Sequence, residues 1–170
     1  EVLIGVHIGG VPSKRWPIEY FAKAIQSLHG KMNCCFVITG GPGEEQLFDQ
    51  LKEKCGAHLI NRVHKTSLKE WMALIAQCKL FLSSDTGAMH IAASLKIPLV
   101  AIFGGGYLTR YDPRKISDRA IVLYKQARCA PCDKVECRSM RCLKEIKPED
   151  VVEAALTFLN SPSQNSVSSC

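Results

Sequence analysis

The chain alternates between short apolar runs and stretches whose apolar residues recur at helical spacing, and this alternation narrows the possible folds more than any other feature. Apolar runs typical of buried strands lie at 2–8, 34–39, 58–61, 80–82, 98–103 and 121–124. The spacing typical of helices with one buried face occurs at 17–29, 44–54, 67–75, 91–95 and 148–159. No Asn-Gly or Asp-Gly pair indicates a hairpin. We therefore predict an α/β fold with a doubly wound, parallel, Rossmann-like sheet.

One of these helices has a clear start signal. Ser67 followed by Glu70 is a capping box. We expect the inner face of this helix to be formed by Leu68, Trp71, Met72 and Ile75. A second start signal is Pro148, which is followed by acidic residues in the first turn of the closing helix.

Length and composition predict one domain. At 170 residues and 46% hydrophobic content, the chain can bury one core, which we place at 1–160, with a loose Ser-rich end at 161–170. No apolar run approaches the ~20 residues of a membrane span, and no charged-then-apolar leader is seen. The net charge of +6 favours anionic ligands. Eleven of the 22 basic residues lie between Arg110 and Lys147, where they could face phosphates, an acidic membrane or solvent.

The segment from Ser83 to His90, SSDTGAMH, is the strongest candidate for a ligand site. It follows a predicted strand and precedes a predicted helix, which places it at the carboxyl edge of the sheet, where open α/β folds bind ligands. Asp85 or Thr86 would cap the helix and leave backbone N–H groups facing the crevice. This arrangement predicts an anion site suited to a diphosphate, with Asp85 and His90 both able to reach its mouth.

Two further glycine-containing turns should converge on the same crevice. Lys14 and Arg15 follow a glycine pair, and either could neutralise a phosphate or remain solvated. The turn at 40–43 resembles a phosphate cradle but lacks the P-loop and dinucleotide fingerprints. Glu44 and Glu45, which follow it, could bind a ribose or a base, or could serve only as first-turn acids.

Four of the nine cysteines cluster near the end of the chain. They are Cys129, Cys132, Cys137 and Cys142. Their spacing could place four thiolates around a zinc ion, or they could remain free thiols. The other cysteines lie in mostly apolar surroundings or in the tail, which suits reduced cytosolic thiols.

Several separated motifs, in the same order, resemble those of glycosyltransferase family nine, the bacterial lipopolysaccharide heptosyltransferases, in their C-terminal half. The resemblance extends from His7 to about Leu159. It rests on SKRWP at 13–17, TGGPGEE at 39–45, KTSL at 65–68 and, most specifically, SDTGAMHIAA at 84–93. It implies a two-domain glycosyltransferase of the B architecture, in which this half, a Rossmann-like domain, binds a nucleotide-sugar donor, typically ADP-heptose.

The resemblance also implies roles for particular residues. Lys14 is expected on the phosphates and Asp85 near the sugar, and these two are the candidates for catalysis. Thr86 and Gly87 would offer backbone N–H groups to the diphosphate, and His90 completes the motif. Where relatives carry hydroxyl residues in the first loop this chain has glycines, so Ser13 or the backbone must supply that phosphate contact. The ribose-binding glutamate maps less securely, to Glu44 or Glu45, and Thr66 or its neighbour would lie near the base.

The family's chemistry is inverting transfer of a sugar to an acceptor hydroxyl. The implied partners are the donor, an N-terminal acceptor-binding domain of the same enzyme, and the lipopolysaccharide core at the membrane surface, with no nucleic acid. No metal or other cofactor is required, because helix amides and Lys14 could stabilise the leaving diphosphate. We expect a cytoplasmic protein, peripheral at the inner face of the membrane. The catalytic base lies in the N-terminal domain, so this chain should be inactive alone.

Two other hypotheses remain open from the sequence. A nicotinamide-dependent oxidoreductase domain would share the fold, although the expected glycine fingerprint after the first strand is missing. A zinc-stabilised interaction module could use the basic C-terminal third on nucleic acid or anionic lipid.

Overall fold

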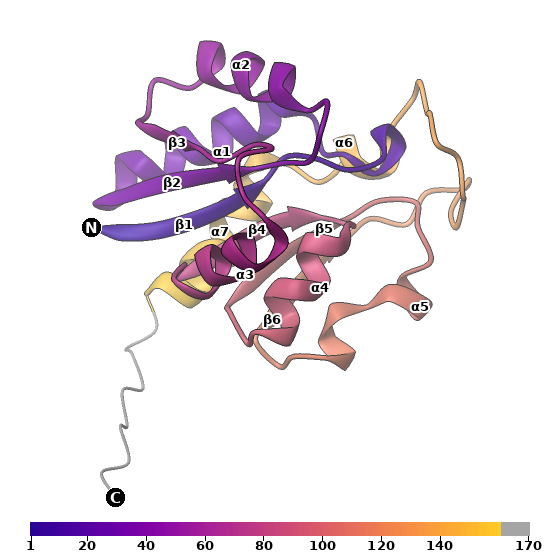
Figure 1. The fold of residues 1–170 in the computed structure, drawn as a ribbon. Helices are drawn as coiled ribbons and strands as arrows, with labels where there is room; N and C mark the ends of the chain where they lie inside the picture. Colours follow the sequence, from indigo (N-terminus) through magenta and orange to yellow (C-terminus); the bar gives the residue numbers. More distant parts are fainter. Residues whose placement is uncertain (161–170) are drawn as a thin grey trace, which may run out of the picture.

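The computed structural model describes residues 1–160 and contains one six-stranded parallel sheet (Figure 1). The strands are β1 (Val2–His7), β2 (Cys34–Thr39), β3 (Leu59–Asn61), β4 (Leu80–Ser84), β5 (Leu99–Phe103) and β6 (Ala120–Tyr124). Their order is β3-β2-β1-β4-β5-β6, and every pairing is parallel. This is the doubly wound, Rossmann-like arrangement predicted from the sequence, and its order reverses between β1 and β4.

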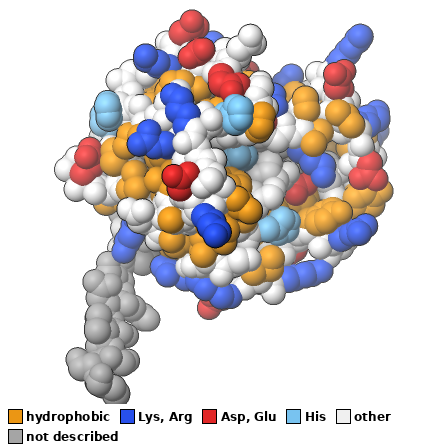
Figure 2. All heavy atoms as spheres, viewed as in Figure 1, with side chains coloured by type: hydrophobic (Ala, Val, Ile, Leu, Met, Phe, Trp, Pro, Cys, Tyr) orange, Lys and Arg blue, Asp and Glu red, His pale blue; other side chains and the backbone are white. Residues whose placement is uncertain are grey.

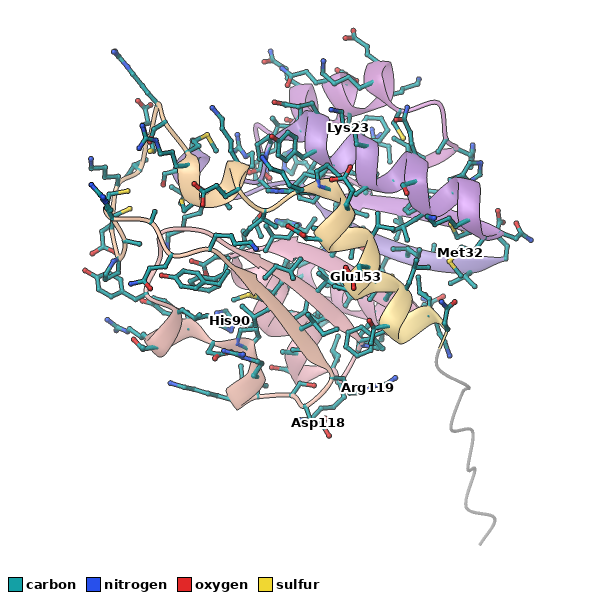
Figure 3. The ribbon with its side chains drawn as sticks, turned by 180° about the vertical axis from the view of Figure 1, so that it is seen from behind. Lys23, Met32, His90, Asp118, Arg119 and Glu153 are labelled. Carbon is teal, nitrogen blue, oxygen red and sulfur yellow. The ribbon has the colours of Figure 1, made fainter. Side chains whose placement is uncertain are left out.

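Helices cover both faces of the sheet. They are α1 (Ile18–Lys31), α2 (Glu45–Lys54), α3 (Leu68–Ala76), α4 (Gly87–Ser94), α5 (Leu108–Tyr111), α6 (Arg141–Lys144) and α7 (Pro148–Leu159), with 3-10 turns η1 (Pro12–Lys14) and η2 (Pro113–Lys115). The first face is covered by α1, α2 and α7, and seen from behind α7 lies beside α1 (Figure 3). The second face is covered by α3 and α4. None of the helices in residues 1–160 is long and apolar enough to cross a bilayer.

The four central strands are mostly buried, with core clusters on both faces of the sheet, which explains why they read as continuous apolar runs. Along β4, Leu80 and Leu82 join the core beneath α1 and α7, whereas Phe81 joins the core beneath α3 and α4. Gly5 in β1 makes room for this ring, since a Cβ there would lie 2.4 Å from Cδ2 of Phe81. The glycine inside the first strand is therefore a packing requirement.

Trp16 fixes the segment between β1 and α1. Its side chain is fully buried. Its backbone N–H donates to Oγ of Ser84 at 3.1 Å, and its indole Nε1 donates to the carbonyl of Ile146 at 3.0 Å. The start of α1 is thus held both to the end of β4 and to the turn before α7.

Helix α3 departs from the prediction. The capping box of Ser67 and Glu70 is present, and Ile75 is fully buried. The predicted inner face is wrong for Leu68 and Met72, however, which are 62% and 38% exposed. The start of α3 lies at the edge of a cavity, so its apolar residues face that cavity or solvent instead of the core. The predicted loose end, 161–170, lies outside the described residues.

Candidate functional site

The loops that follow β1, β2, β4 and β5 meet at the carboxyl edge of the sheet, on the right in Figure 1. The predicted convergence of the first three turns is confirmed by contacts between them. The N–H of Gly10 donates to Oε1 of Glu44 at 2.7 Å, and a Cβ at Gly10 would lie 2.5 Å from Cγ2 of Thr86. Histidine and apolar side chains lie along the hollowed band on this face of the molecule (Figure 2).

Lys14 and Asp85 form an ion pair at this edge. Nζ of Lys14 lies 3.1 Å from Oδ2 of Asp85, with 22% and 6% of the two side chains exposed. Oδ2 has no partner in hydrogen-bond geometry within residues 1–160, so the contact with Lys14 is ionic only. Gly106 closes over the pair, because a Cβ there would lie 2.6 Å from Oδ2. Oδ2 therefore has unused acceptor capacity, but it is buried beneath these residues.

The amino terminus of α4 lies beside this pair. Thr86 is the N-cap residue, as predicted, but its side chain does not cap the helix. Its Oγ1 instead lies 3.2 Å from Oγ of Ser83. The first N–H groups of a helix have no partner within it, and the helix dipole makes this end positive. Gly87 is exposed, and a Cβ there would meet nothing within 4 Å, so these amides border open space suited to an anion.

Glu44 has a different environment from the one predicted. Its Oε1 accepts from Gly10, and its Oε2 accepts from the N–H of Gly41 at 2.5 Å. Nη2 of Arg15 lies 3.4 Å from Oε1. A Cβ at Gly9 would lie 1.8 Å from Oε2, so only glycine fits there. Glu44 therefore joins the loops after β1 and β2, and its contact with a ribose stays a prediction.

Glu45, the second acidic candidate for the ribose, lies away from these loop contacts. It is exposed, and its Oε1 lies 2.9 Å from Nδ1 of His64. A hydrogen bond from its own backbone, the largest cause, and one with His64 lower the pKa of Glu45.

A cavity of about 300 Å³ lies between the loop after β2 and the start of α3. Its lining includes Thr66, the residue predicted near the base, together with His7, Leu68 and Trp71. Nδ1 of His7 lies 3.0 Å from Oγ1 of Thr39, and the ring centroids of His7 and Trp71 are 5.5 Å apart. Burial lowers the pKa of His7 to about 4, so this ring is neutral at neutral pH.

The sequence reasoning missed His7 and Trp71 as site residues. Apolar periodicity predicted only that His7 lies in a strand and that Trp71 faces the core. A histidine at the carboxyl end of a central strand was the available signal. The indole Nε1 of Trp71 is buried and has no hydrogen-bond partner in the part of the chain that the structure describes.

Tyr111, at the end of α5, was also missed. Its ring centroid lies 5.8 Å from Nζ of Lys14 and 6.3 Å from the centroid of His90. The predicted candidate His90 is half-buried and packs edge-on against Tyr111, the ring that also lies near Lys14. No sequence pattern predicted α5, because a four-residue helix has too few positions to show periodicity.

Ser13 is turned toward the cysteine-containing segment. Its N–H donates to the carbonyl of Val135 at 3.0 Å, and its hydroxyl donates to the carbonyl of Lys134. The hydroxyl predicted to contact phosphate is therefore already engaged and buried.

The four-thiolate zinc site is not formed. Within residues 1–160, no group of three or more histidine, cysteine or acidic side chains is arranged to hold a metal ion. Cys137 contacts Ser139 and Met140 instead. The prediction of a zinc-stabilised module was based on sequence spacing, which does not fix where the sulfurs point.

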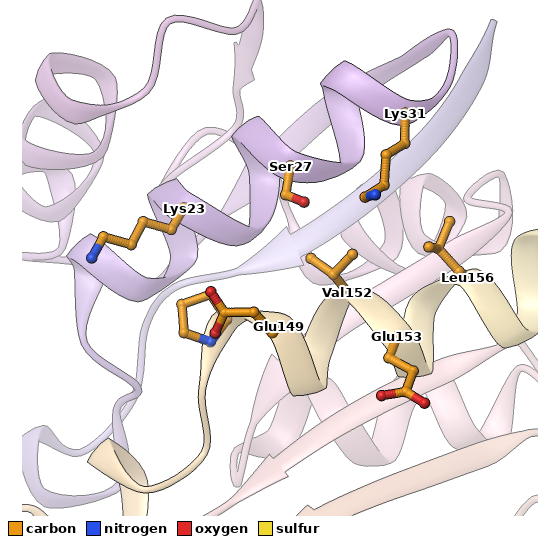
Figure 4. Close-up of a pocket in the computed structure, with 8 residues that line it drawn as sticks. Lys23, Ser27, Lys31, Glu149, Val152, Glu153 and Leu156 are labelled. Atoms are coloured by element: carbon orange, nitrogen blue, oxygen red, sulfur yellow. The ribbon is translucent and has the colours of Figure 1, made fainter.

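A groove of about 400 Å³ lies away from this edge, between α1 and α7 (Figure 4). Its lining residues include Lys23, Lys31, Glu149 and Glu153. Two basic and two acidic side chains leave it without a charge preference, and none of the predicted site residues lines it.

The sheet order and the crossovers define a Rossmann-like, doubly wound α/β domain. The family model of glycosyltransferase family 9 (heptosyltransferase) matches residues 5–143, and the chain belongs to this family. Lipooligosaccharide heptosyltransferase 2 of Campylobacter jejuni is 32% identical over 155 residues, which are 88% of this chain and 48% of that protein.

Solved structures agree with this assignment. The Escherichia coli ADP-heptose lipopolysaccharide heptosyltransferase II is 26% identical, with a TM-score of 0.78 over 94% of this chain and 46% of that one. A family 9 glycosyltransferase from Veillonella parvula is 30% identical, with a TM-score of 0.78 over 95% of this chain and 47% of that one. The chain spans about half the length of these relatives.

Proposed function

We propose that this chain is the donor-binding, C-terminal half of an inverting heptosyltransferase of the B architecture. The observation that carries the proposal is the Lys14–Asp85 pair beside the uncapped amino terminus of α4. An ammonium group and free amides favour a diphosphate. A carboxylate beside that ammonium group suits a sugar hydroxyl. The similar Escherichia coli structure is an ADP-heptose lipopolysaccharide heptosyltransferase, which supports ADP-heptose as the donor.

The cavity beside α3 provides a place for the base. Its lining includes the aromatic rings of His7 and Trp71 and the apolar side chain of Leu68. Neutral His7 adds no charge to the cavity at neutral pH. With the base there, the ribose lies near Thr66 and the turn at 40–44, and the diphosphate reaches Thr86, Gly87 and Lys14. The sugar then lies near Asp85, with His90 and Tyr111 beside the ion pair.

In the proposed reaction an acceptor hydroxyl attacks the anomeric carbon while the nucleoside diphosphate leaves from the opposite face. Lys14 and the amides of α4 stabilise the charge that develops on the leaving diphosphate. These groups can do so without a metal ion. The base that deprotonates the acceptor and the acceptor pocket belong to the other half of the enzyme. The acceptor is the lipopolysaccharide core, met at the inner face of the cytoplasmic membrane.

Calorimetric titration of the 170-residue chain with ADP, UDP, GDP and ADP-heptose tests this proposal. We expect ADP and ADP-heptose to bind, Lys14→Ala to weaken both, and Lys23→Ala on α1 to have no effect. An NADH titration tests the oxidoreductase hypothesis, which no feature of the described site favours. Equal ADP binding by the parent chain and the Lys14→Ala variant would show that the site is misassigned.

A further inference from the structure

The segment from Ala127 to Cys142, here called the cysteine strap, joins two loops of the carboxyl edge. The N–H of Ser13 donates to the carbonyl of Val135 at 3.0 Å, which ties the strap to the loop after β1. The N–H of Cys132 donates to the carbonyl of Gly105 at 2.6 Å, which ties it to the loop after β5. The strap therefore bridges the loop that carries Lys14 and the loop that covers Asp85.

Two sulfurs of the strap adjoin the same space above Gly105. A Cβ at Gly105 would lie 3.0 Å from Sγ of Cys132 and 3.7 Å from Sγ of Cys142. Because residue 105 is glycine, no side chain separates these sulfurs there. Both thiols are free, with Cys132 half-buried and Cys142 buried. The neighbouring Gly106 contacts the ion pair, since a Cβ there would lie 3.4 Å from Nζ of Lys14.

We propose that Cys132 and Cys142 are a redox-active thiol pair, which a small-molecule disulfide converts to an intramolecular disulfide that locks the strap against both loops. The formation of this bond is independent of the proposed function. Its effect on nucleotide affinity rests on that function.

The chemistry follows thiol–disulfide exchange. The more accessible Cys132, as thiolate, attacks oxidised glutathione and releases one glutathione thiolate. Cys142 then attacks the sulfur of Cys132, forms the protein disulfide and releases the second glutathione. Two protein thiols are oxidised, one glutathione disulfide is reduced, and the two thiol protons pass to the two glutathione thiolates. Cys142 is buried and Cys132 is half-buried, so Cys132 meets the oxidant first and Cys142 reacts second.

Other described thiols fit this role less well. Burial raises the pKa of Cys78 to about 12, which makes it inert. Cys129 is exposed and does not adjoin Gly105. A hydrogen bond with Ser139, the largest cause, lowers the pKa of Cys137, whose sulfur also accepts from the N–H of Met140 at 3.4 Å. Cys137 should react with oxidised glutathione but form only a mixed disulfide, which makes it a matched control.

The test uses the 170-residue chain carrying Cys170→Ser, treated with oxidised glutathione, alkylated and mapped by peptide mass spectrometry. We expect a Cys132–Cys142 bond and a glutathione adduct on Cys137. We expect oxidation to tighten ADP binding roughly three-fold or more, because the loops are then pre-organised. Cys132→Ser and Cys142→Ser should each abolish the bond and the tighter ADP binding. Because Cys132 is only half-buried, Cys132→Ser keeps the test valid if Cys142→Ser, at a buried position, misfolds. Cys137→Ser should behave like the parent.

Three results would overturn the inference. They are a mapped bond to Cys129 instead, unchanged or weaker ADP binding after oxidation, and stoichiometric zinc held by the reduced chain but lost in Cys132→Ser. If the bond forms but ADP binds neither the reduced nor the oxidised chain, the cysteine pairing is supported. The effect of the bond on nucleotide affinity then fails together with the proposed function. If ADP binds but no bond forms, only the inference fails.

Discussion

Nζ of Lys14 lies 3.1 Å from Oδ2 of Asp85, although 70 residues of chain separate the two. The pairing of β1 with β4 brings them together, because the loops after these two strands are neighbours at the carboxyl edge. Each side chain compensates the other's charge in a site with little access to water. In the proposed function, each contacts a different part of the nucleotide sugar.

Removing the ammonium group should weaken diphosphate binding. We expect Lys14→Met to raise the dissociation constant for ADP by about ten- to a hundred-fold, which corresponds to a charge-assisted interaction of about 1.5–3 kcal/mol. AMP, which lacks the second phosphate, should be affected less. Calorimetry on both nucleotides checks this, and an equal loss for AMP and ADP would contradict a contact with the diphosphate.

Neutralising Asp85 should act on the sugar and not on the nucleotide. We expect Asp85→Asn to leave ADP affinity within about three-fold, and to remove about ten-fold of any preference for ADP-heptose over ADP. The reason is that Oδ2 has no other hydrogen-bond partner in the described chain. A variant that loses ADP affinity as strongly as Lys14→Met would mean that Asp85 acts mainly by positioning Lys14.

Glu44 should contribute to stability as well as to any ligand contact. Glu44→Ala leaves the N–H groups of Gly10 and Gly41 without their acceptor, so we expect unfolding to be easier by about 1–3 kcal/mol. Glu45→Ala is the control, because its pair with His64 is exposed and screened by solvent. Urea denaturation at pH 7 compares the two, and equal losses would show that the loop contacts of Glu44 are not stabilising.

His7 should make the fold sensitive to mild acid. Burial lowers its pKa from 6.5 to about 4, so the unfolded chain binds more protons between these values. The stability that neutral His7 contributes is complete above pH 6.5 and is lost as the pH falls toward 4, by about 2 kcal/mol between pH 7.5 and 5. His7→Asn should reduce that loss, and His58→Gln at an exposed position should not. Urea denaturation at both pH values measures it, and a parental acid response in His7→Asn would refute the assignment.

Two glycine substitutions should have opposite effects. A Cβ at Gly9 would lie 1.8 Å from Oε2 of Glu44, so Gly9→Ala should disturb the loop and destabilise the fold by about 1–3 kcal/mol. Gly30 lies near the end of α1 with open space around it, so Gly30→Ala should stabilise by up to about 1 kcal/mol. Thermal unfolding of both variants is the measurement, and destabilisation by Gly30→Ala would contradict the open space seen there.

The sheet could be predicted from the sequence because its strands are apolar on both faces and its helices are not. β2 matches its predicted run residue for residue, and the other strands differ by one or two positions. Helix α3 shows the limit of this reasoning. Leu68, Trp71 and Ile75 share helical spacing, but Ile75 is fully buried, Trp71 packs against the core only partly buried, and Leu68 is exposed. Helical spacing indicates which residues share a face of the helix, but it does not indicate how much of that face is covered by the sheet.

The site was predictable where backbone position alone decides it. Asp85 and Thr86 lie at the carboxyl edge simply because they follow β4. Side-chain direction was not predictable for Glu44 or Ser13, since each binds backbone groups of a loop distant in sequence. Tyr111 was missed for a related reason, because its contacts with Lys14 and His90 exist only after four separate crossovers have formed.

Trp16 limits how the lysine-bearing loop can move. Its two anchors, to Ser84 and to the carbonyl of Ile146, fix the chain only two residues after Lys14. A hinge for any donor-induced closure must therefore lie upstream, among the glycines that follow β1, and α1 should stay still while Lys14 swings.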